Sequence, residues 1–169
     1  MRSKYFIATT FLFFAIAAHP QRYYHASFGT VSPKELANSL IANAKTDEQK
    51  VYALFRWITD NVDYRLKPVG VKSIPPDTST VLRPLDEIVA EHVLRNKVAV
   101  CDGYSRLFKT LCTYAGIKCE VINGYAKNGT ERVGRRFRTN HTWNAVFIDS
   151  VWKLLDVTWA SGFVSYRGD

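Results

Sequence analysis

Apolar residues recur at helical spacing near the middle of the chain, after a short extended apolar run. The run at 98–100 leads into Cys101, and a stripe at i, i+3, i+4, i+7, i+8 and i+11 starts from Tyr104. The stripe consists of Tyr104, Leu107, Phe108, Leu111, Cys112 and Ala115. This is the period of one helix face, and Gly116 is a typical residue after a last turn. The pattern predicts a core helix that begins at Cys101.

Two capping patterns predict helices in the N-terminal part. Residues 32–35 read Ser-Pro-Lys-Glu, with serine as N-cap, proline at the first helical position and glutamate at the third. Residues 46–49 read Thr-Asp-Glu-Gln and open a longer helix to about Asn61. Its apolar stripe is Val51, Leu54, Phe55, Ile58 and Val62, with Trp57 on a flank. A further short helix is predicted over 86–95, with His92 expected at its surface.

Proline and charge interrupt the remaining chain. Residues 66–84 contain four prolines and predict a long loop, which either covers one rim of a cleft or is disordered. Strands are predicted over 118–126, 140–148 and 151–159. A basic segment separates the first two strands; we expect a solvated loop, with an arm that selects acidic substrates as the alternative. It contains Lys127, Arg132, Arg135, Arg136 and Arg138.

The last two strands form a hairpin whose register brings a histidine to an aspartate. With Asp149 and Ser150 as a two-residue loop, opposing residue numbers sum to 299. Trp143 then faces Asp156, and His141 faces Thr158. His141 and Asp156 become diagonal neighbours on one face, with backbones roughly 7–8 Å apart. We expect this face to pack on the Cys101 helix, because its other residues are apolar. They are Trp143, Ala145, Phe147, Trp152 and Leu154.

These residue types predict nucleophilic catalysis. A helix start favours a thiolate at Cys101, and a buried carboxylate at Asp156 needs a partner such as His141. If the three meet, cysteine is the nucleophile, histidine the general acid and base, and aspartate the orienting group. The alternatives are a small buried Cys101, a His141–Asp156 pair that only holds two strands together, and a metal site made of all three residues.

Composition and the first residues indicate an exported globular protein. Arg2 and Lys4 precede an uncharged apolar run over 6–18, and Ala15-Ile16-Ala17 fits a cleavage site, so residues 1–17 are predicted to be a signal peptide. An uncleaved anchor is the alternative. Cleavage would lower the net charge from +8 to +6 through the loss of those two cations. No basic helix is interleaved with aromatic residues, so nucleic acid is not an expected partner.

Three cysteines make an odd number for an exported chain. Cys112 lies on the apolar face of the central helix and Cys119 on the next strand. We expect two separate buried thiols there, with a Cys112–Cys119 disulfide as the alternative. Either arrangement leaves Cys101 unpaired. There is no CxxC pair and no spacing typical of structural zinc.

Several blocks together resemble the transglutaminase-like superfamily. They are Cys101-Asp102-Gly103-Tyr104-Ser105, Leu111-Cys112, Ala115-Gly116-Ile117, Asn123-Gly124-Tyr125-Ala126, His141-Thr142-Trp143-Asn144-Ala145 and Leu155-Asp156-Val157-Thr158-Trp159. The resemblance extends from about Val51 to Trp159. It implies an α+β, papain-like core with N-terminal helices and a cysteine-bearing helix packed on a small antiparallel sheet. It also implies domain bounds of 18–45 for an N-terminal arm with a short helix and 46–169 for the family domain.

Position by position, Cys101, His141 and Asp156 match the nucleophile, base and orienting acid of that family. The resemblance implies a cysteine peptidase, amidase or protein-glutamine acyltransferase of an exported, microbial type, with protein or peptide substrates. We expect hydrolysis rather than cross-linking, because water is the abundant acceptor. No cofactor or metal is expected, since the acidic residues are scattered and form no Asp-rich loop. A non-catalytic binding or scaffolding module is the alternative. The Cys101 N–H is one expected oxyanion donor; Trp57, Tyr64 or the 66–84 loop supplies a second. The chain stops ten residues after Trp159, where family members continue with strands, so it is either a trimmed fold or a fragment.

Overall fold

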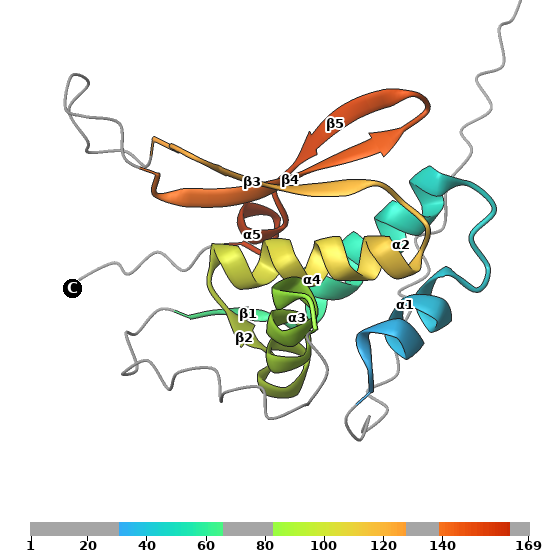
Figure 1. The fold of residues 1–169 in the computed structure, drawn as a ribbon, viewed down its shortest axis with the longest axis horizontal. Helices are drawn as coiled ribbons and strands as arrows, with labels where there is room; N and C mark the ends of the chain where they lie inside the picture. Colours follow the sequence, from blue (N-terminus) through green and yellow to red (C-terminus); the bar gives the residue numbers. More distant parts are fainter. Residues whose placement is uncertain (1–30, 66–82, 128–138, 163–169) are drawn as a thin grey trace, which may run out of the picture.

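The computed structural model describes residues 31–65, 83–127 and 139–162, and within them the fold is α+β, as predicted (Figure 1). The helices are α1 Pro33–Ile41, α2 Asp47–Asn61, α3 Leu85–Asn96, α4 Cys101–Tyr114 and α5 Val157–Ala160. The strands are β1 Asp63–Tyr64, β2 Val98–Ala99, β3 Cys119–Gly124, β4 His141–Ile148 and β5 Val151–Leu155. The predicted signal peptide and most of the predicted loops lie outside the described residues.

Helix α4 is the centre of the fold. It lies between the antiparallel sheet β3-β4-β5 on one side and α1 and α3 on the other (Figure 1). Five residues of its predicted apolar stripe are fully buried: Tyr104, Leu107, Phe108, Leu111 and Cys112. The helix stops where Gly116 takes a φ of 75°, a conformation that glycine adopts without strain. The predicted core helix and its bounds are confirmed.

Both predicted helix starts are confirmed by their hydrogen bonds. The Ser32 hydroxyl accepts the Glu35 N–H at 3.2 Å, and the Glu35 carboxylate accepts the Ser32 N–H at 3.1 Å. At α2 the Thr46 hydroxyl accepts the Gln49 N–H at 3.2 Å. These bonds satisfy backbone donors that a helix cannot satisfy itself, which is why the two patterns locate the starts.

The hairpin has the predicted register. Ile148 pairs with Val151 and Asn144 with Leu155, so each pair sums to 299. The two loop residues, Asp149 and Ser150, have φ values of 53° and 63°. Positive φ at both central positions is the geometry of a type I′ turn, which matches the twist of an antiparallel pair.

The strand after the turn is shorter than predicted. It ends at Leu155 rather than near Trp159, and residues 157–160 form α5 instead. The cause is local, because the Asp156 side chain accepts the Trp159 N–H at 3.0 Å and caps a helical turn. Trp143 therefore does not face Asp156 in the ladder, and the predicted pair of His141 with Thr158 does not form.

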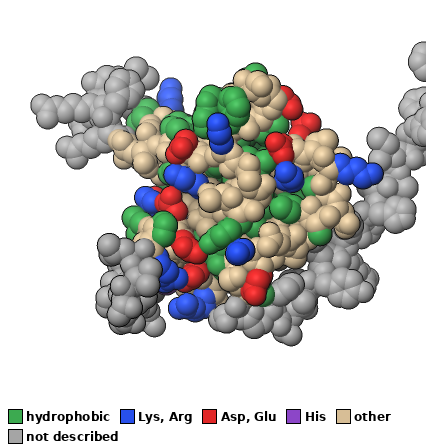
Figure 2. All heavy atoms as spheres, turned by 45° about the vertical axis from the view of Figure 1, so that its right-hand side comes forward, with side chains coloured by type: hydrophobic (Ala, Val, Ile, Leu, Met, Phe, Trp, Pro, Cys, Tyr) green, Lys and Arg blue, Asp and Glu red, His purple; other side chains and the backbone are tan. Residues whose placement is uncertain are grey.

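The prediction that the tryptophan-rich face packs on the central helix is wrong. Trp152 and Leu154 on that face are 50% and 73% exposed, whereas Val146 and Ile148 on the opposite face belong to the core. Asn144 makes this packing favourable, because its buried Nδ2 donates to the Ser105 carbonyl of α4 at 3.0 Å. The hydrogen bonds of Nδ2 offset part of the cost of burying the amide, whereas the buried Oδ1 has no hydrogen-bond partner among the described residues. Hydrophobic side chains are accordingly visible at the upper surface in Figure 2.

Candidate active site

Cys101 is the first residue of α4, where the extended chain after β2 turns into the helix. The first backbone bond of the helix runs from the Tyr104 N–H to the carbonyl of Val100. Among the described residues no side chain caps this end. The N–H groups of the first turn keep hydrogen-bonding capacity, and the helix dipole favours negative charge beside them. The half-buried Cys101 side chain is therefore attached to the helix end that favours a negatively charged sulfur.

The carboxylate next to Cys101 is bound by an arginine. Arg106 donates through Nε to both oxygens of Asp102, at 3.0 and 2.9 Å, and its Nη1 pairs with Asp86 of α3. An unpaired carboxylate at this place would disfavour a thiolate, and the pairing reduces that penalty. The i, i+4 spacing of Asp102 and Arg106 is visible in the sequence. Asp86 belongs to α3, 20 residues before Arg106, so no short spacing in the sequence indicates that the two residues pair.

His141 and Asp156 are in direct contact. His141 begins β4, Asp156 follows β5, and His141 Nε2 lies 2.6 Å from Asp156 Oδ2. Their side chains are 10% and 23% exposed. If Nε2 donates its proton to the carboxylate, the neutral ring has its lone pair on Nδ1, which is then available to accept a proton. The structure brings together these two predicted residues, although Asp156 reaches His141 from beyond the end of the ladder.

Trp159 of α5 stacks on the imidazole, an interaction that the strand prediction missed. The ring centroids of Trp159 and His141 are 4.8 Å apart with an angle of 21° between planes, and the Trp143 ring lies 5.9 Å away on the same imidazole. Trp159 is 58% exposed, so its ring lies between the imidazole and solvent over part of the surface. Such cover limits competition of water for the hydrogen bond to Asp156.

Cys101 and His141 lie at the same end of the packed α4 and β4. Near this end, Asn144 of β4 donates to Ser105 of α4. The Cys119 thiol contacts Cys112 of α4 and also Nδ2 of the same Asn144. In Figure 1 α4 and β4 both run from the left of the view to the right, so both elements begin on the same side of the fold. Among the described residues no hydrogen bond joins the Cys101 thiol to the imidazole.

Tyr64 and Trp57 have different surroundings. They are the candidates for a second oxyanion donor among the described residues, because most of the 66–84 loop lies outside them. Tyr64 of β1 pairs with Ala99, two residues before Cys101. Burial and the charge of the nearby Cys101 raise the pKa of Tyr64 above its usual value. Trp57 is buried and its ring lies under the Lys97 ammonium, 4.2 Å from the ring centroid. Tyr64 is thus the candidate that the structure places beside the thiol.

The other two thiols are free and buried, as predicted. A hydrogen bond with Cys119, followed by burial, raises the pKa of Cys112 well above its usual value. Among the described residues no three His, Cys, Asp or Glu side chains are grouped as a metal site. Within the same part of the chain, no helix has both the length and the apolar character needed to cross a membrane.

Comparisons with known proteins agree with this geometry. A family model described as the Transglutaminase-like superfamily matches residues 34–157. A curated relative, the Kyphoscoliosis peptidase of Homo sapiens, is 33% identical over 132 residues, which are 77% of this chain and 18% of that protein. The chain therefore spans less than a fifth of that relative's length.

Two solved structures share the fold at low sequence identity. The periplasmic domain of TgpA from Pseudomonas aeruginosa has a TM-score of 0.55 and 20% identity, and the match covers 79% of this chain and 44% of that one. A candidate cysteine protease from Cytophaga hutchinsonii has a TM-score of 0.50 and 22% identity, covering 74% of this chain and 36% of that one.

Proposed function

Because the chain belongs to the transglutaminase-like superfamily, we propose that it is a thiol-dependent acyl-transfer enzyme acting on amide bonds of peptides or proteins. Cys101 is the proposed nucleophile, His141 the general acid and base, and Asp156 the group that fixes the histidine tautomer. The observation that carries the proposal is the 2.6 Å contact between His141 Nε2 and Asp156 Oδ2, at the end of the sheet where α4 begins.

The proposed reaction begins when Nδ1 of His141 takes the thiol proton of Cys101. The sulfur attacks the carbonyl carbon of an amide, and the developing oxyanion receives a hydrogen bond from the Cys101 N–H. The C–N bond then breaks, and the proton on His141 passes to the leaving amine. Water next attacks the thioester, its proton returns through His141 to the sulfur, and the acid is released.

We propose hydrolysis as the main outcome, because water is the most abundant acceptor wherever a cleft is not built to exclude it. The names of two similar proteins support hydrolysis: the human relative is called a peptidase, and the Cytophaga hutchinsonii structure is that of a candidate cysteine protease. With a lysine amine in place of water, the same thioester would give a cross-link.

The test compares labelling of Cys101 by iodoacetamide in the wild type and in His141→Ala. The proposal requires fast labelling at neutral pH and a sharp fall in the variant. His92→Ala on α3 is the matched control, since it removes a half-buried histidine from another element. Release of amine or ammonia from peptide libraries then identifies the substrate. Slow labelling that is equal in all three proteins would instead support the non-catalytic binding module.

We also propose that the protein acts outside the cytoplasm, on the basis of the signal-peptide pattern at residues 1–17. A periplasmic protein domain among the similar structures is consistent with this. Expression of the full chain with intact-mass measurement of the exported product tests it. A product that lacks about the first 17 residues supports the proposal, and a full-length product retained in the cell contradicts it.

A further inference from the structure

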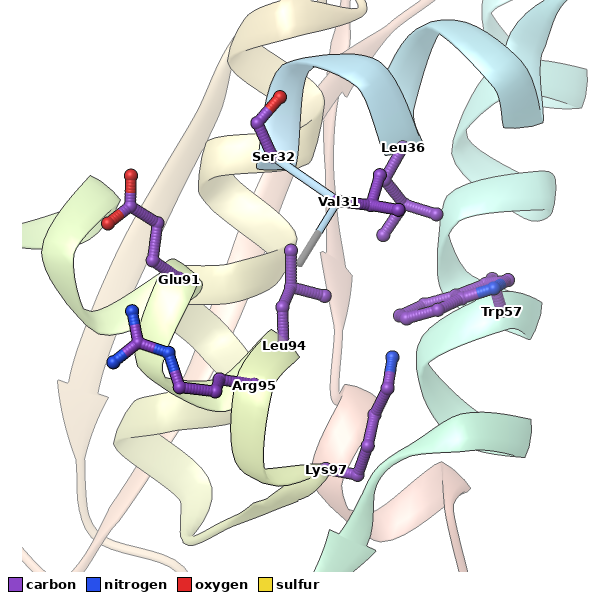
Figure 3. Close-up of a pocket in the computed structure, with 8 residues that line it drawn as sticks. All are labelled: Val31, Ser32, Leu36, Trp57, Glu91, Leu94, Arg95 and Lys97. Carbon is purple, nitrogen blue, oxygen red and sulfur yellow. The ribbon is translucent and has the colours of Figure 1, made fainter. Parts of the chain in front are cut away.

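A pocket of about 360 Å³ lies between α1, α2 and α3, away from the proposed catalytic residues (Figure 3). Its lining residues are Val31, Ser32, Leu36, Trp57, Glu91, Leu94, Arg95 and Lys97. Neither Cys101, His141 nor Asp156 is among them. This volume is in the range of pockets that hold a small molecule or the end of a peptide. Four of the lining residues are apolar or aromatic: Val31, Leu36, Trp57 and Leu94.

The pocket carries uncompensated positive charge. Its one carboxylate, that of Glu91, is paired with Arg83 at 2.7 Å. Within the described part of the chain, no carboxylate lies at ion-pair distance from Arg95 or Lys97. The Ser32 hydroxyl is already used in the cap of α1. The groups left for a ligand are therefore two cations. In Figure 3 the Lys97 ammonium lies beside Leu94 and Trp57, and the Arg95 side chain extends toward the Glu91 side of α3.

Lys97 has a backbone conformation that lysine disfavours. It caps α3 with a φ of 55°, in the left-handed region where glycine or asparagine is usual. Its ammonium lies 4.2 Å from the centroid of the Trp57 ring (Figure 3). Burial lowers the pKa of Lys97 from its usual value. The backbone does not favour lysine here, so the contact of its ammonium with the Trp57 ring is what this side chain contributes.

We propose that this pocket binds an apolar carboxylate, in which an aromatic or aliphatic group lies against Leu36, Leu94 and Trp57 and the carboxylate pairs with Lys97. Arg95 at the rim strengthens the attraction for the anion. A carboxylate would supply the counter-charge that Lys97 lacks among the described residues, and the apolar part would fill the space between the helices. The C-terminal residue of a peptide and a free small acid share this chemistry.

The experiment uses the full chain with Cys101→Ala, so that binding is measured without turnover and independently of the proposed function. The probes are N-acetylphenylalanine and N-acetyl-Ala-Ala-Phe, each as the free acid and as the amide. Calorimetry measures affinity, and the indole N–H signal of Trp57, assigned with Trp57→Phe, reports the site. We expect each acid to bind about tenfold more tightly than its amide and to shift this signal.

The deciding variant is Lys97→Asn, which suits the left-handed backbone and replaces the long cationic side chain with a short neutral one. We expect acid binding about tenfold weaker with no loss of thermal stability. Lys153→Gln, which removes one positive charge from β5, is the matched control and should bind as before. Equal affinity for acid and amide, or equal losses in the two lysine variants, would overturn the proposal. If the tripeptide acid binds more tightly than N-acetylphenylalanine, the ligand is the C-terminus of a peptide. If the two acids bind equally, the ligand is a free small acid.

Discussion

Replacing Asp156 with asparagine separates the two contacts that this side chain makes. Oδ2 lies 2.6 Å from His141 Nε2, and Oδ1 accepts the Trp159 N–H that starts α5. Asparagine is as good an N-cap as aspartate, so Asp156→Asn keeps the second contact. Its NH₂ group donates to Nε2, however, which moves the ring proton to Nδ1. The imidazole then has no lone pair directed at a thiol.

The expected magnitudes follow from these two contacts. Asp156→Asn should change the free energy of unfolding by less than about 1 kcal/mol, because both hydrogen bonds are replaced. Asp156→Ala loses the cap and leaves a mostly buried ring nitrogen without a partner, and should cost about 2–4 kcal/mol. Turnover should fall by roughly 10⁴-fold in the asparagine variant, the scale seen when an orienting carboxylate is replaced in a catalytic triad.

The assay is the rate of iodoacetamide labelling at Cys101, measured by mass spectrometry across pH, together with urea unfolding. Without the proton acceptor the Cys101 thiol is not activated, and iodoacetamide reacts with the thiolate rather than with the thiol. Labelling in Asp156→Asn should fall on the order of 10- to 100-fold while unfolding stays as in the wild type. Unchanged labelling in a folded Asp156→Asn protein would refute the orienting role of Asp156.

Three further predictions follow from other contacts. Trp159→Ala should lower turnover about tenfold, and it should lower the free energy of unfolding by less than about 1 kcal/mol because the ring is 58% exposed. Trp152→Ala is the control: this ring is 50% exposed on the sheet, and its loss should change neither turnover nor the free energy of unfolding. Gly103→Ala should cost about 1–3 kcal/mol in urea unfolding, because an added Cβ would lie 2.9 Å from the Ala99 Cβ; wild-type stability would contradict this packing. Cys112 should resist iodoacetamide until the protein unfolds, since its hydrogen bond with the Cys119 thiol and its burial raise its pKa. Labelling of the native protein at Cys112 as fast as at Cys101 would contradict this.

The predictions that held depend on local hydrogen bonds or on turn length. The cap residues Ser32 and Thr46 bind N–H groups three residues away, so the sequence alone locates both helices. The register of β4 and β5 depends on a two-residue turn, and a turn of that length allows few pairings. The sequence could therefore pair His141 with Asp156, although Asp156 lies one residue beyond the end of β5 and not on the strand.

The predictions that failed required knowledge of tertiary contacts. The apolar count favoured the face of Trp152 and Leu154 as the buried one, but Asn144 is the residue that meets α4. A prediction from apolar spacing counts asparagine as polar and therefore as exposed. In the structure, Nδ2 of Asn144 donates to the Ser105 and Glu120 carbonyls, and the side chain is buried. No pattern within β4 contains these partners, because they belong to α4 and β3.

The end of β5 shows how a wrong element still led to a correct pair. An extended strand through Trp159 would place this tryptophan opposite residue 140 and on the other face of the sheet from His141, because side chains alternate along a strand. Capping by Asp156 instead starts a helical turn, which stacks the Trp159 ring on the imidazole with 4.8 Å between the ring centroids. The carboxylate that contacts the histidine therefore also starts the turn that covers it. Both contacts depend on one side chain, so the His141–Asp156 geometry and the position of α5 should be lost together in Asp156→Ala and kept together in Asp156→Asn.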